Sequence, residues 1–256
     1  MDESNATSTE LPSRELFTPK DEAAAEEIAT DACVVIPMFN EAQVIADVIS
    51  EVRGCFEHVL CVDDGSSDDS AERARKAGAT VVQHPVNLGQ GAALQTGLSF
   101  ALRNPGFSYF VTFDADGQHD PHDALAMVAE ARGTGADAVL GSRFLEESSS
   151  NVPLSRRVLL RGAVTFTWLT TGMKLTDAHN GLRVLNRRGA AAINLQLPGM
   201  AHASEIVSQI GRGNLSYREF PVSIRYTDYS RKKGQSNINA LNIAFDVMAH
   251  RVRRPS

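Results

Sequence analysis

Residues 110–120 read Phe-Val-Thr-Phe-Asp-Ala-Asp-Gly-Gln-His-Asp, an apolar run that ends abruptly on acidic residues. The apolar part predicts a buried β-strand. Because side chains alternate along an extended chain, Asp114, Asp116 and Gln118 would project to the same side, at a strand end where open α/β sheets bind ligands. Two carboxylates and an amide oxygen are hard ligands that suit Mg²⁺ or Mn²⁺. A strand running into a polar turn has the same pattern, so the other motifs must decide.

Short apolar segments alternate with helical ones along the chain. Strands are expected at residues 33–37, 59–62, 80–83, 110–113 and 136–141. Helices are expected after Asn40, which would cap the first of them, at 70–77, and from the stretch 87–93 to about 102. This alternation predicts an α/β fold, a single Rossmann-like domain whose central, mainly parallel sheet is flanked by helices. Right-handed crossovers would place the carboxyl ends of the strands on one edge.

The composition is that of an ordinary globular protein. The chain has 256 residues, of which 22% are charged and 43% hydrophobic, so it can bury one substantial core. A net charge of -6 argues against broad nucleic-acid binding. The sequence shows no apolar run of about 18 residues, so no membrane-spanning helix is expected, and no signal peptide is expected either. The three cysteines, Cys33, Cys55 and Cys61, form no Cys-x-x-Cys pair, which fits buried thiols in a reducing compartment.

Missing motifs exclude two classes of nucleotide-binding protein. The turn after the first strand reads Pro-Met-Phe-Asn-Glu at 37–41, without the glycine signature of dinucleotide-binding folds. No Gly-Lys-Ser/Thr phosphate-binding loop occurs. The glycine-rich stretch 87–91 more often serves tight backbone packing than phosphate binding. Polar pairs that follow three strands should share one crevice: Asn40 with Glu41, Asp63 with Asp64, and Asp114 with Asp116.

Four motifs together resemble the inverting family 2 glycosyltransferases of GT-A fold. They are Val35-Ile36-Pro37-Met38-Phe39-Asn40-Glu41, Val62-Asp63-Asp64-Gly65-Ser66, Asn87-Leu88-Gly89-Gln90-Gly91 and Asp114-Ala115-Asp116-Gly117-Gln118. Within that family the chain most resembles the dolichyl- and polyprenyl-phosphate sugar synthases, from about residue 33 to about residue 237. The resemblance implies a nucleotide-sugar donor, either a UDP- or a GDP-sugar, with Mg²⁺ or Mn²⁺ on its diphosphate. It also implies direct displacement at the anomeric carbon.

The resemblance also implies roles for individual residues. The nucleotide-sugar would be bound by Pro37, Phe39, Glu41, Asp63, Asp64, Asp114, Ala115, Arg143, Arg231 and Lys233. Phe39 stands where the family usually has tyrosine, and Asp63 is equally typical of a turn that caps the next helix. Asp114, Asp116 and Gln118 would hold the metal. Asp116 is the first candidate catalytic residue, followed by Asp114 and Arg143.

The acceptor side is expected in the second half of the chain. Arg156 falls on a phosphate-binding arginine of the family, in an amphipathic stretch at 153–170 that suits either a membrane interface or the protein's own core. Asn180 and Arg183 would also contact the acceptor phosphate, although His179 and Asn180 replace small hydroxyl residues of the family. The basic loop at 231–233 would close over the diphosphate.

The principal hypothesis is a metal-dependent transfer of sugar to polyprenyl phosphate, and two alternatives stay open. A sugar-hydroxyl acceptor would need a base, for which Glu205 and His202 are candidates. A non-catalytic protein would bind the nucleotide-sugar without turnover. The expected organisation is a flexible tail at 1–30, a catalytic domain at 31–237, and an amphipathic helix with a basic end at 238–256. We expect a cytoplasmic protein peripheral to the inner face of the membrane, attached directly or through a small membrane-protein partner.

Overall fold

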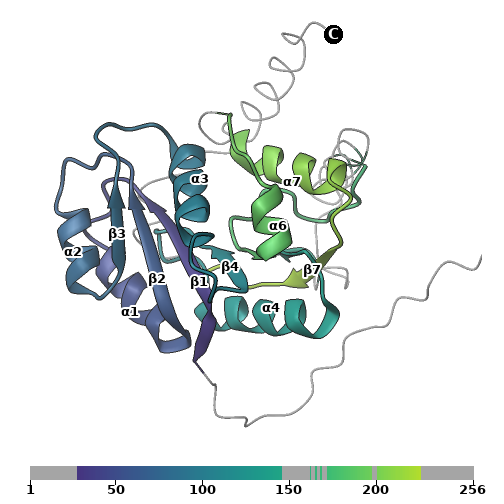
Figure 1. Cartoon of the computed structure of the whole chain (residues 1–256), viewed down its shortest axis with the longest axis horizontal. Coiled ribbons are helices and arrows are strands. Elements are labelled where there is room, and N and C mark those ends of the chain that lie inside the picture. The colour runs from purple at the N-terminus through teal and green to yellow at the C-terminus, as the bar shows by residue number, and fades with distance from the viewer. Residues whose placement is uncertain are drawn as a thin grey trace, which may run out of the picture.

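The computed structural model describes residues 28–145, 172–197 and 201–225, together with positions 162, 165 and 168. Within these residues a central sheet has seven strands in the order β3-β2-β1-β4-β6-β5-β7 (Figure 1). The strands are β1 (Ala29–Met38), β2 (Phe56–Asp63), β3 (Thr80–Gln83), β4 (Tyr109–Thr112), β5 (Ala138–Ser142), β6 (Arg183–Asn186) and β7 (Tyr217–Pro221). The helices are α1 (Ile45–Cys55), α2 (Ser70–Lys76), α3 (Gln90–Ala101), α4 (Pro121–Thr134), α6 (Arg187–Ala192) and α7 (His202–Arg212).

The sheet is mainly parallel, as the alternation of strands and helices predicts. β1 pairs in parallel with both β2 and β4, and β2 pairs in parallel with β3. β6 lies between β4 and β5 and is antiparallel to both, which makes the sheet mixed. The carboxyl ends of β1, β2 and β4 therefore meet on one edge, and the expected α/β fold is confirmed.

Helices cover both faces of the sheet, and alternate residues of β1 show how. Val34 and Ile36 belong to one buried cluster, together with apolar residues of α1, α2 and α4. Cys33 and Val35 belong to the other, with residues of α3, α6 and α7. Because successive side chains of a strand point to opposite faces, the continuous apolar run of β1 serves both cores.

Several expected boundaries are wrong. β1 begins at Ala29, inside the segment expected to be a flexible tail, and β2 begins at Phe56 directly after α1. Asn40 does not cap α1, which begins five residues later with Val44 at the capping position. Asn40 has a φ of 55°, and its side-chain oxygen accepts a hydrogen bond from the backbone N–H of Ser67. It braces the loop after β2 instead.

Some expectations fall outside the described residues. These concern Arg156, Arg231, Lys233, the tail up to residue 27 and the segment 238–256. In the part of the chain that is described, no helix has the length and apolar character needed to cross a membrane. The three cysteines are free and buried, as expected, and burial raises the pKa of the Cys33 thiol to about 12.

Candidate functional site

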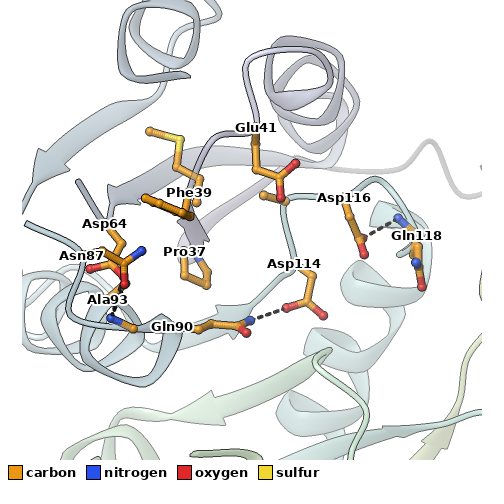
Figure 2. Close-up of a pocket in the computed structure, with 13 residues that line it drawn as sticks. Pro37, Phe39, Glu41, Asp64, Asn87, Gln90, Ala93, Asp114, Asp116 and Gln118 are labelled. Carbon is orange, nitrogen blue, oxygen red and sulfur yellow. Dashed lines mark hydrogen bonds between the residues drawn. The ribbon is translucent and has the colours of Figure 1, made fainter. Parts of the chain in front are cut away.

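A cleft of about 420 Å³ opens at the carboxyl edge of β1, β2 and β4 (Figure 2). We call it the edge cleft; its lining is Pro37, Met38, Phe39, Glu41, Asp64, Asn87, Gly89, Gln90, Ala93, Asp114, Ala115, Asp116 and Gln118. Eight residues predicted to bind nucleotide-sugar or metal therefore lie together, namely Pro37, Phe39, Glu41, Asp64, Asp114, Ala115, Asp116 and Gln118. The topology explains this gathering, since each lies at or just after the end of one of three adjacent strands.

Asp114 and Asp116 form the acidic end of the edge cleft. Asp114 follows β4, and its two oxygens accept hydrogen bonds from Gln90 Nε2 at 3.1 Å and His119 Nε2 at 3.0 Å. Burial raises the pKa of Asp114, but the hydrogen bond from His119 and the charge of Arg183 outweigh it and hold the pKa below its ordinary value. Asp114 is therefore ionised at neutral pH.

Asp116 is less well compensated than Asp114. Its Oδ1 accepts one hydrogen bond, from the backbone N–H of Gln118 at 3.1 Å. Burial, together with the negative charge of Asp114, raises the pKa of Asp116 above its ordinary value. The two carboxylates repel each other, so a cation between them would relieve this cost.

The donor set at this end fits a divalent cation. Asp114 and Asp116 supply carboxylate oxygens, and Gln118 lines the same part of the cleft. Mg²⁺ is commonly held by one or two carboxylates, with waters and substrate phosphates as its other ligands. No group of three or more His, Cys, Asp or Glu side chains in the described segments could hold a metal by itself. The arrangement thus suits a metal shared with a ligand.

Gly181 packs directly against Asp114. A Cβ atom at this position would lie 2.1 Å from Asp114 Oδ2, well inside van der Waals contact. The carbonyl of Gly181 accepts a hydrogen bond of 2.7 Å from Thr112 Oγ1, which fixes the glycine to the end of β4. Only a residue without a side chain fits here, and the loop that precedes β6 thereby determines where the Asp114 carboxylate lies.

The opposite end of the edge cleft is built around Asp64 and Phe39. Asp64 is 3% exposed and accepts hydrogen bonds from the backbone N–H groups of Leu88 and Gly89 and from His84. Phe39 is 42% exposed, so its ring is open to a stacking partner. The glycine-rich stretch thus binds the Asp64 carboxylate through its backbone.

Asp63 does not line the edge cleft, although a nucleotide contact was predicted for it. Its Oδ1 accepts from the backbone N–H of Ser66 at 3.1 Å, and its Oδ2 accepts from Gln83 Nε2 at 3.0 Å. The side chain is buried and ties the turn after β2 to β3. The structure supports the interpretation of Asp63 as a turn residue.

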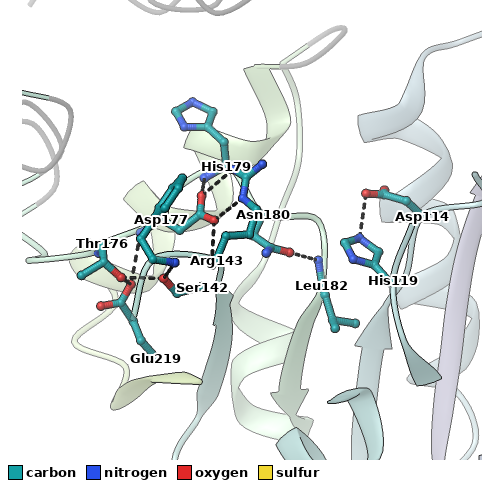
Figure 3. A network of polar contacts seen from close by, with 11 residues as sticks. Asp114, His119, Ser142, Arg143, Thr176, Asp177, His179, Asn180, Leu182 and Glu219 are labelled. Atoms are coloured by element: carbon teal, nitrogen blue, oxygen red, sulfur yellow. Dashed lines mark hydrogen bonds and ion pairs between the residues drawn. The ribbon is translucent and has the colours of Figure 1, made fainter. Parts of the chain in front are cut away.

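Arg143 follows β5 and is held by Asp177 (Figure 3). The Nε–Oδ2 distance is 2.6 Å and the Nη2–Oδ1 distance is 2.9 Å, a forked ion pair. Burial raises the pKa of Asp177, but Arg143 outweighs it and the pKa is lowered. The Arg143 side chain is 39% exposed, so it remains accessible from solvent.

Glu219 holds the loop that carries Asp177. Its Oε1 accepts hydrogen bonds from the backbone N–H groups of Thr176 and Asp177 and from the Thr176 hydroxyl, at 2.7 to 3.2 Å (Figure 3). Burial raises the pKa of Glu219. The sequence contains no local signal for this role, because Glu219 lies more than 40 residues from both partners.

Asn180 and Arg183, the predicted acceptor contacts, are both buried. Asn180 Oδ1 accepts from the backbone N–H of Leu182 at 2.9 Å. Arg183 is 2% exposed, and burial lowers its pKa to about 10 even though Asp114 and Asp177 oppose the shift. Asn180 Nδ2 and Arg183 Nη2 have no hydrogen-bond partner among the described residues. Arg183 stabilises the charge of Asp114 from within the protein and does not present a phosphate-binding surface.

Neither of the two candidate general bases, Glu205 and His202, is placed as an exposed side chain that could accept a proton from a substrate. The Glu205 carboxylate accepts hydrogen bonds from the backbone N–H groups of Gln196 at 3.0 Å and Leu197 at 2.9 Å. It therefore caps the loop before α7. His202 is 4% exposed, and a Cβ atom on Gly91 would approach it to 3.0 Å. Close packing explains the glycine at position 91, as expected for that stretch.

Comparisons with known proteins agree with this geometry. Residues 33–193 match the model of the family described as glycosyl transferase family 2. A UDP-N-acetylglucosamine–dolichyl-phosphate N-acetylglucosaminyltransferase of Methanococcus voltae is 27% identical, over 84% of this chain and 94% of that protein. A polyprenol monophosphomannose synthase of Mycolicibacterium smegmatis is 29% identical, over 88% and 89%.

A solved structure shows the same fold. It is glucosyl-3-phosphoglycerate synthase from Mycobacterium tuberculosis, in complex with Mn²⁺ and uridine-diphosphate-glucose. The TM-score is 0.61 at 20% sequence identity, and the match covers 85% of this chain and 76% of that one. At this identity the likeness establishes the architecture of the domain.

Proposed function

Because this chain belongs to glycosyl transferase family 2, we propose that it moves a sugar from a nucleoside-diphosphate sugar to a polyprenyl phosphate. The chain is a glycosyltransferase of GT-A fold, and the proposal concerns its substrates. Two of its relatives are named for transfer to dolichyl phosphate and for synthesis of polyprenol monophosphomannose, which supports a lipid phosphate as acceptor.

The observation that carries the donor proposal is the polarity of the edge cleft. Figure 2 shows Phe39 and Asp64 toward one side of the cleft and Asp116 and Gln118 toward the other. An aromatic ring with an acceptor suits a base, whereas paired carboxylates suit a metal-bound diphosphate. A nucleoside-diphosphate sugar has these two parts in the same order, so one molecule satisfies both ends.

Asp114, Asp116 and Gln118 would hold Mg²⁺ or Mn²⁺ at the acidic end. When bound there, the cation would offset the negative charge of the departing nucleoside diphosphate. Asp114 is kept ionised by His119 and Arg183, and Gly181 leaves the space that its carboxylate occupies. These residues prepare the site before any ligand binds.

The acceptor side favours a phosphate over a sugar hydroxyl. Glu205 is committed to the backbone of residues 196 and 197, and His202 is buried, so neither side chain is placed as an open general base. A phosphate acceptor is already anionic and needs no base. Arg143, oriented by Asp177, is proposed to bind phosphate in the reaction.

The proposed reaction is an in-line displacement. An oxygen of the lipid phosphate forms a bond to the anomeric carbon as the bond from that carbon to the diphosphate oxygen breaks, and the configuration inverts. The proposal also assigns phosphate contacts to Arg156, Arg231 and Lys233, which lie outside the described residues. It places the protein at the inner face of the membrane, where a polyprenyl phosphate would be reached.

The test is transfer of labelled sugar into an organic phase. The protein is incubated with UDP- or GDP-sugars and Mg²⁺ or Mn²⁺, with polyprenyl phosphate vesicles in one reaction and a water-soluble oligosaccharide in a parallel one. We expect label in the lipid with at least one donor, and its loss in Asp116→Asn at unchanged melting temperature. Asp69→Asn, at an exposed aspartate directly before α2, is the matched control and should be fully active.

Three results would contradict parts of the proposal. Sugar transfer by Asp116→Asn at the wild-type rate would contradict the proposal that Asp116 binds the metal. Label that enters only a water-soluble saccharide would support the sugar-hydroxyl alternative. Binding of a nucleotide-sugar with no turnover on any acceptor would support a non-catalytic binding protein.

A further inference from the structure

The carboxylate of Asp64 is nearly saturated with donors from the protein itself. An ionised carboxylate offers about four lone-pair positions. Three are used: Oδ1 receives His84 Nδ1 at 2.8 Å and the N–H of Leu88 at 2.9 Å, while Oδ2 receives the N–H of Gly89 at 2.7 Å. Among the described residues no donor occupies the fourth position, on Oδ2, and Asp64 lines the edge cleft. The cleft therefore offers a ligand one acceptor from this side chain.

His84 holds Asp64 in this state. Its ring is 9% exposed, and its two nitrogens are bonded to Asp64 Oδ1 and, at 2.9 Å, to Thr96 Oγ1 of α3. Since an ionised carboxylate only accepts, Nδ1 must carry the proton that is shared with Asp64. With one nitrogen fixed by Asp64 and the other by Thr96, the ring cannot turn. His84 is thus a positioning residue for the Asp64 carboxylate.

We propose that this arrangement selects uracil as the base of the donor. The inference rests on the proposed function, namely that the edge cleft binds a nucleoside-diphosphate sugar. Uracil presents a single ring N–H between two carbonyl oxygens, so one acceptor in the cleft satisfies its only donor on that edge. The single open position on Asp64 Oδ2 matches this pattern.

The other bases match it less well. Guanine presents two adjacent donors, its ring N1–H and its exocyclic amino group, which a carboxylate binds with both oxygens. At Asp64 the second oxygen, Oδ1, already accepts two hydrogen bonds. Adenine and cytosine carry a ring nitrogen with a lone pair at the corresponding position, which a carboxylate repels. In each case a buried polar group would be left unsatisfied or opposed, which is costly.

Asn87 supplies the complementary donor. Its side chain lines the edge cleft, and its Oδ1 accepts the backbone N–H of Gly89 at 3.1 Å. This N–H is shared with Asp64 Oδ2, to which it is closer. The Asn87 oxygen thus faces the Gly89 backbone, and the amide NH₂ can bond a ligand acceptor such as a uracil carbonyl. An acceptor on Asp64 beside a donor on Asn87 complements an N–H that lies next to a carbonyl. Uracil has a carbonyl on both sides of its ring N–H and so fits this pair in either orientation, whereas guanine fits it only on the side of its O6.

Calorimetric titration of the intact protein with UDP and with GDP, each in the presence of Mn²⁺, tests the selection. We expect UDP to bind at least about tenfold more tightly, the equivalent of one unsatisfied hydrogen-bonding group. Equal or tighter binding of GDP would overturn the inference and leave the proposed function intact. Failure of both nucleotides to bind would overturn the proposed function as well, so the two failures are distinguishable.

Two variants test the role of His84. His84→Ala frees a lone pair on Asp64 Oδ1 and lets the carboxylate turn, so the ratio of UDP to GDP affinity should fall by about tenfold. Thr96→Val removes only the outer partner of the ring and should lower the ratio by less. His58→Ala, near the amino-terminal end of β2, is the control and should not change it. A folded His84→Ala or Thr96→Val protein with an unchanged ratio would contradict the positioning role, because general loosening would weaken both nucleotides alike.

Discussion

Gly181→Ala should displace the carboxylate on which the metal proposal depends. The new Cβ atom would be built 2.1 Å from Asp114 Oδ2 and 2.7 Å from its Cγ. Real Cβ atoms are essentially never found closer than 3.0 Å to another heavy atom, so the oxygen has to retreat by about 0.9 Å. The glycine itself has little freedom to move, because its carbonyl is bound to Thr112.

A shift of this size affects both hydrogen bonds of Asp114. The bonds from Gln90 at 3.1 Å and His119 at 3.0 Å would be broken or would pull their partners along. Misplacement of a reacting group by about 1 Å can cost roughly 10²-fold in rate. We therefore expect kcat/KM for sugar transfer to fall by about 10²-fold and the apparent affinity for Mn²⁺ to weaken.

The assay is initial-rate transfer at several Mn²⁺ concentrations, with thermal melting as the check on folding. Gly133→Ala is the matched control, because a Cβ atom there meets no atom within 4 Å. It lies inside α4, where alanine is favoured over glycine by about 1 kcal/mol, so the control should be active and slightly more stable. A Gly181→Ala protein with wild-type rate and wild-type Mn²⁺ dependence would refute the role given to Asp114.

Three further predictions concern buried carboxylates. The pKa of Asp177 is lowered in the folded protein, so its pairing with Arg143 contributes stability at neutral pH that is lost as the pH falls through the lowered pKa. When melting temperature is plotted against pH, Asp177→Asn should therefore show a smaller decrease on the acid side than wild type. The pKa of Glu219 is raised, so its contribution is complete below the ordinary value of 4.5 and is lost as the pH rises through the raised value. Glu219→Gln keeps an acceptor oxygen, and melting curves should show it at least as stable as wild type at neutral pH. Asp137→Ala removes the acceptor of the Ser216 backbone N–H and hydroxyl, of Asn186 Nδ2 and of Arg188 Nη1, and should lower the free energy of unfolding by about 2 kcal/mol in urea titrations.

The order of elements and the position of the cleft were predictable from the sequence. The predicted strand segments end at Pro37, Val62 and Phe113, and the polar residues beside those ends are visible without any structure. The parallel arrangement follows from the helices between them, and one edge for all carboxyl ends follows from the handedness of the crossovers. Periodicity and chain connectivity are local properties, which is why sequence patterns report them.

The partners of buried polar groups were not predictable. Asn40 and Ser67 are 27 residues apart, and Arg143 and Asp177 are 34 apart, so no local pattern links them. The resemblance of residues 177–183 to a family segment at the acceptor site predicts that Arg183 contacts the acceptor phosphate. Arg183 is buried because β6 enters the sheet antiparallel between β4 and β5, an insertion that the regular alternation does not predict.

Asp64 and Asp116 show what such partners decide. In the sequence both are aspartates that follow an apolar strand, and no local pattern says how many donors the folded protein gives to each. In the structure Asp64 receives three donors, two of them from the backbone of residues 88 and 89, whereas Asp116 receives one and faces the charge of Asp114. The first carboxylate is therefore restricted to a single directional hydrogen bond, which is a means of selecting a base. The second retains uncompensated charge, which is a means of attracting a cation. The loop before α3 creates this difference, because its residues 88 and 89 donate backbone hydrogen bonds to Asp64.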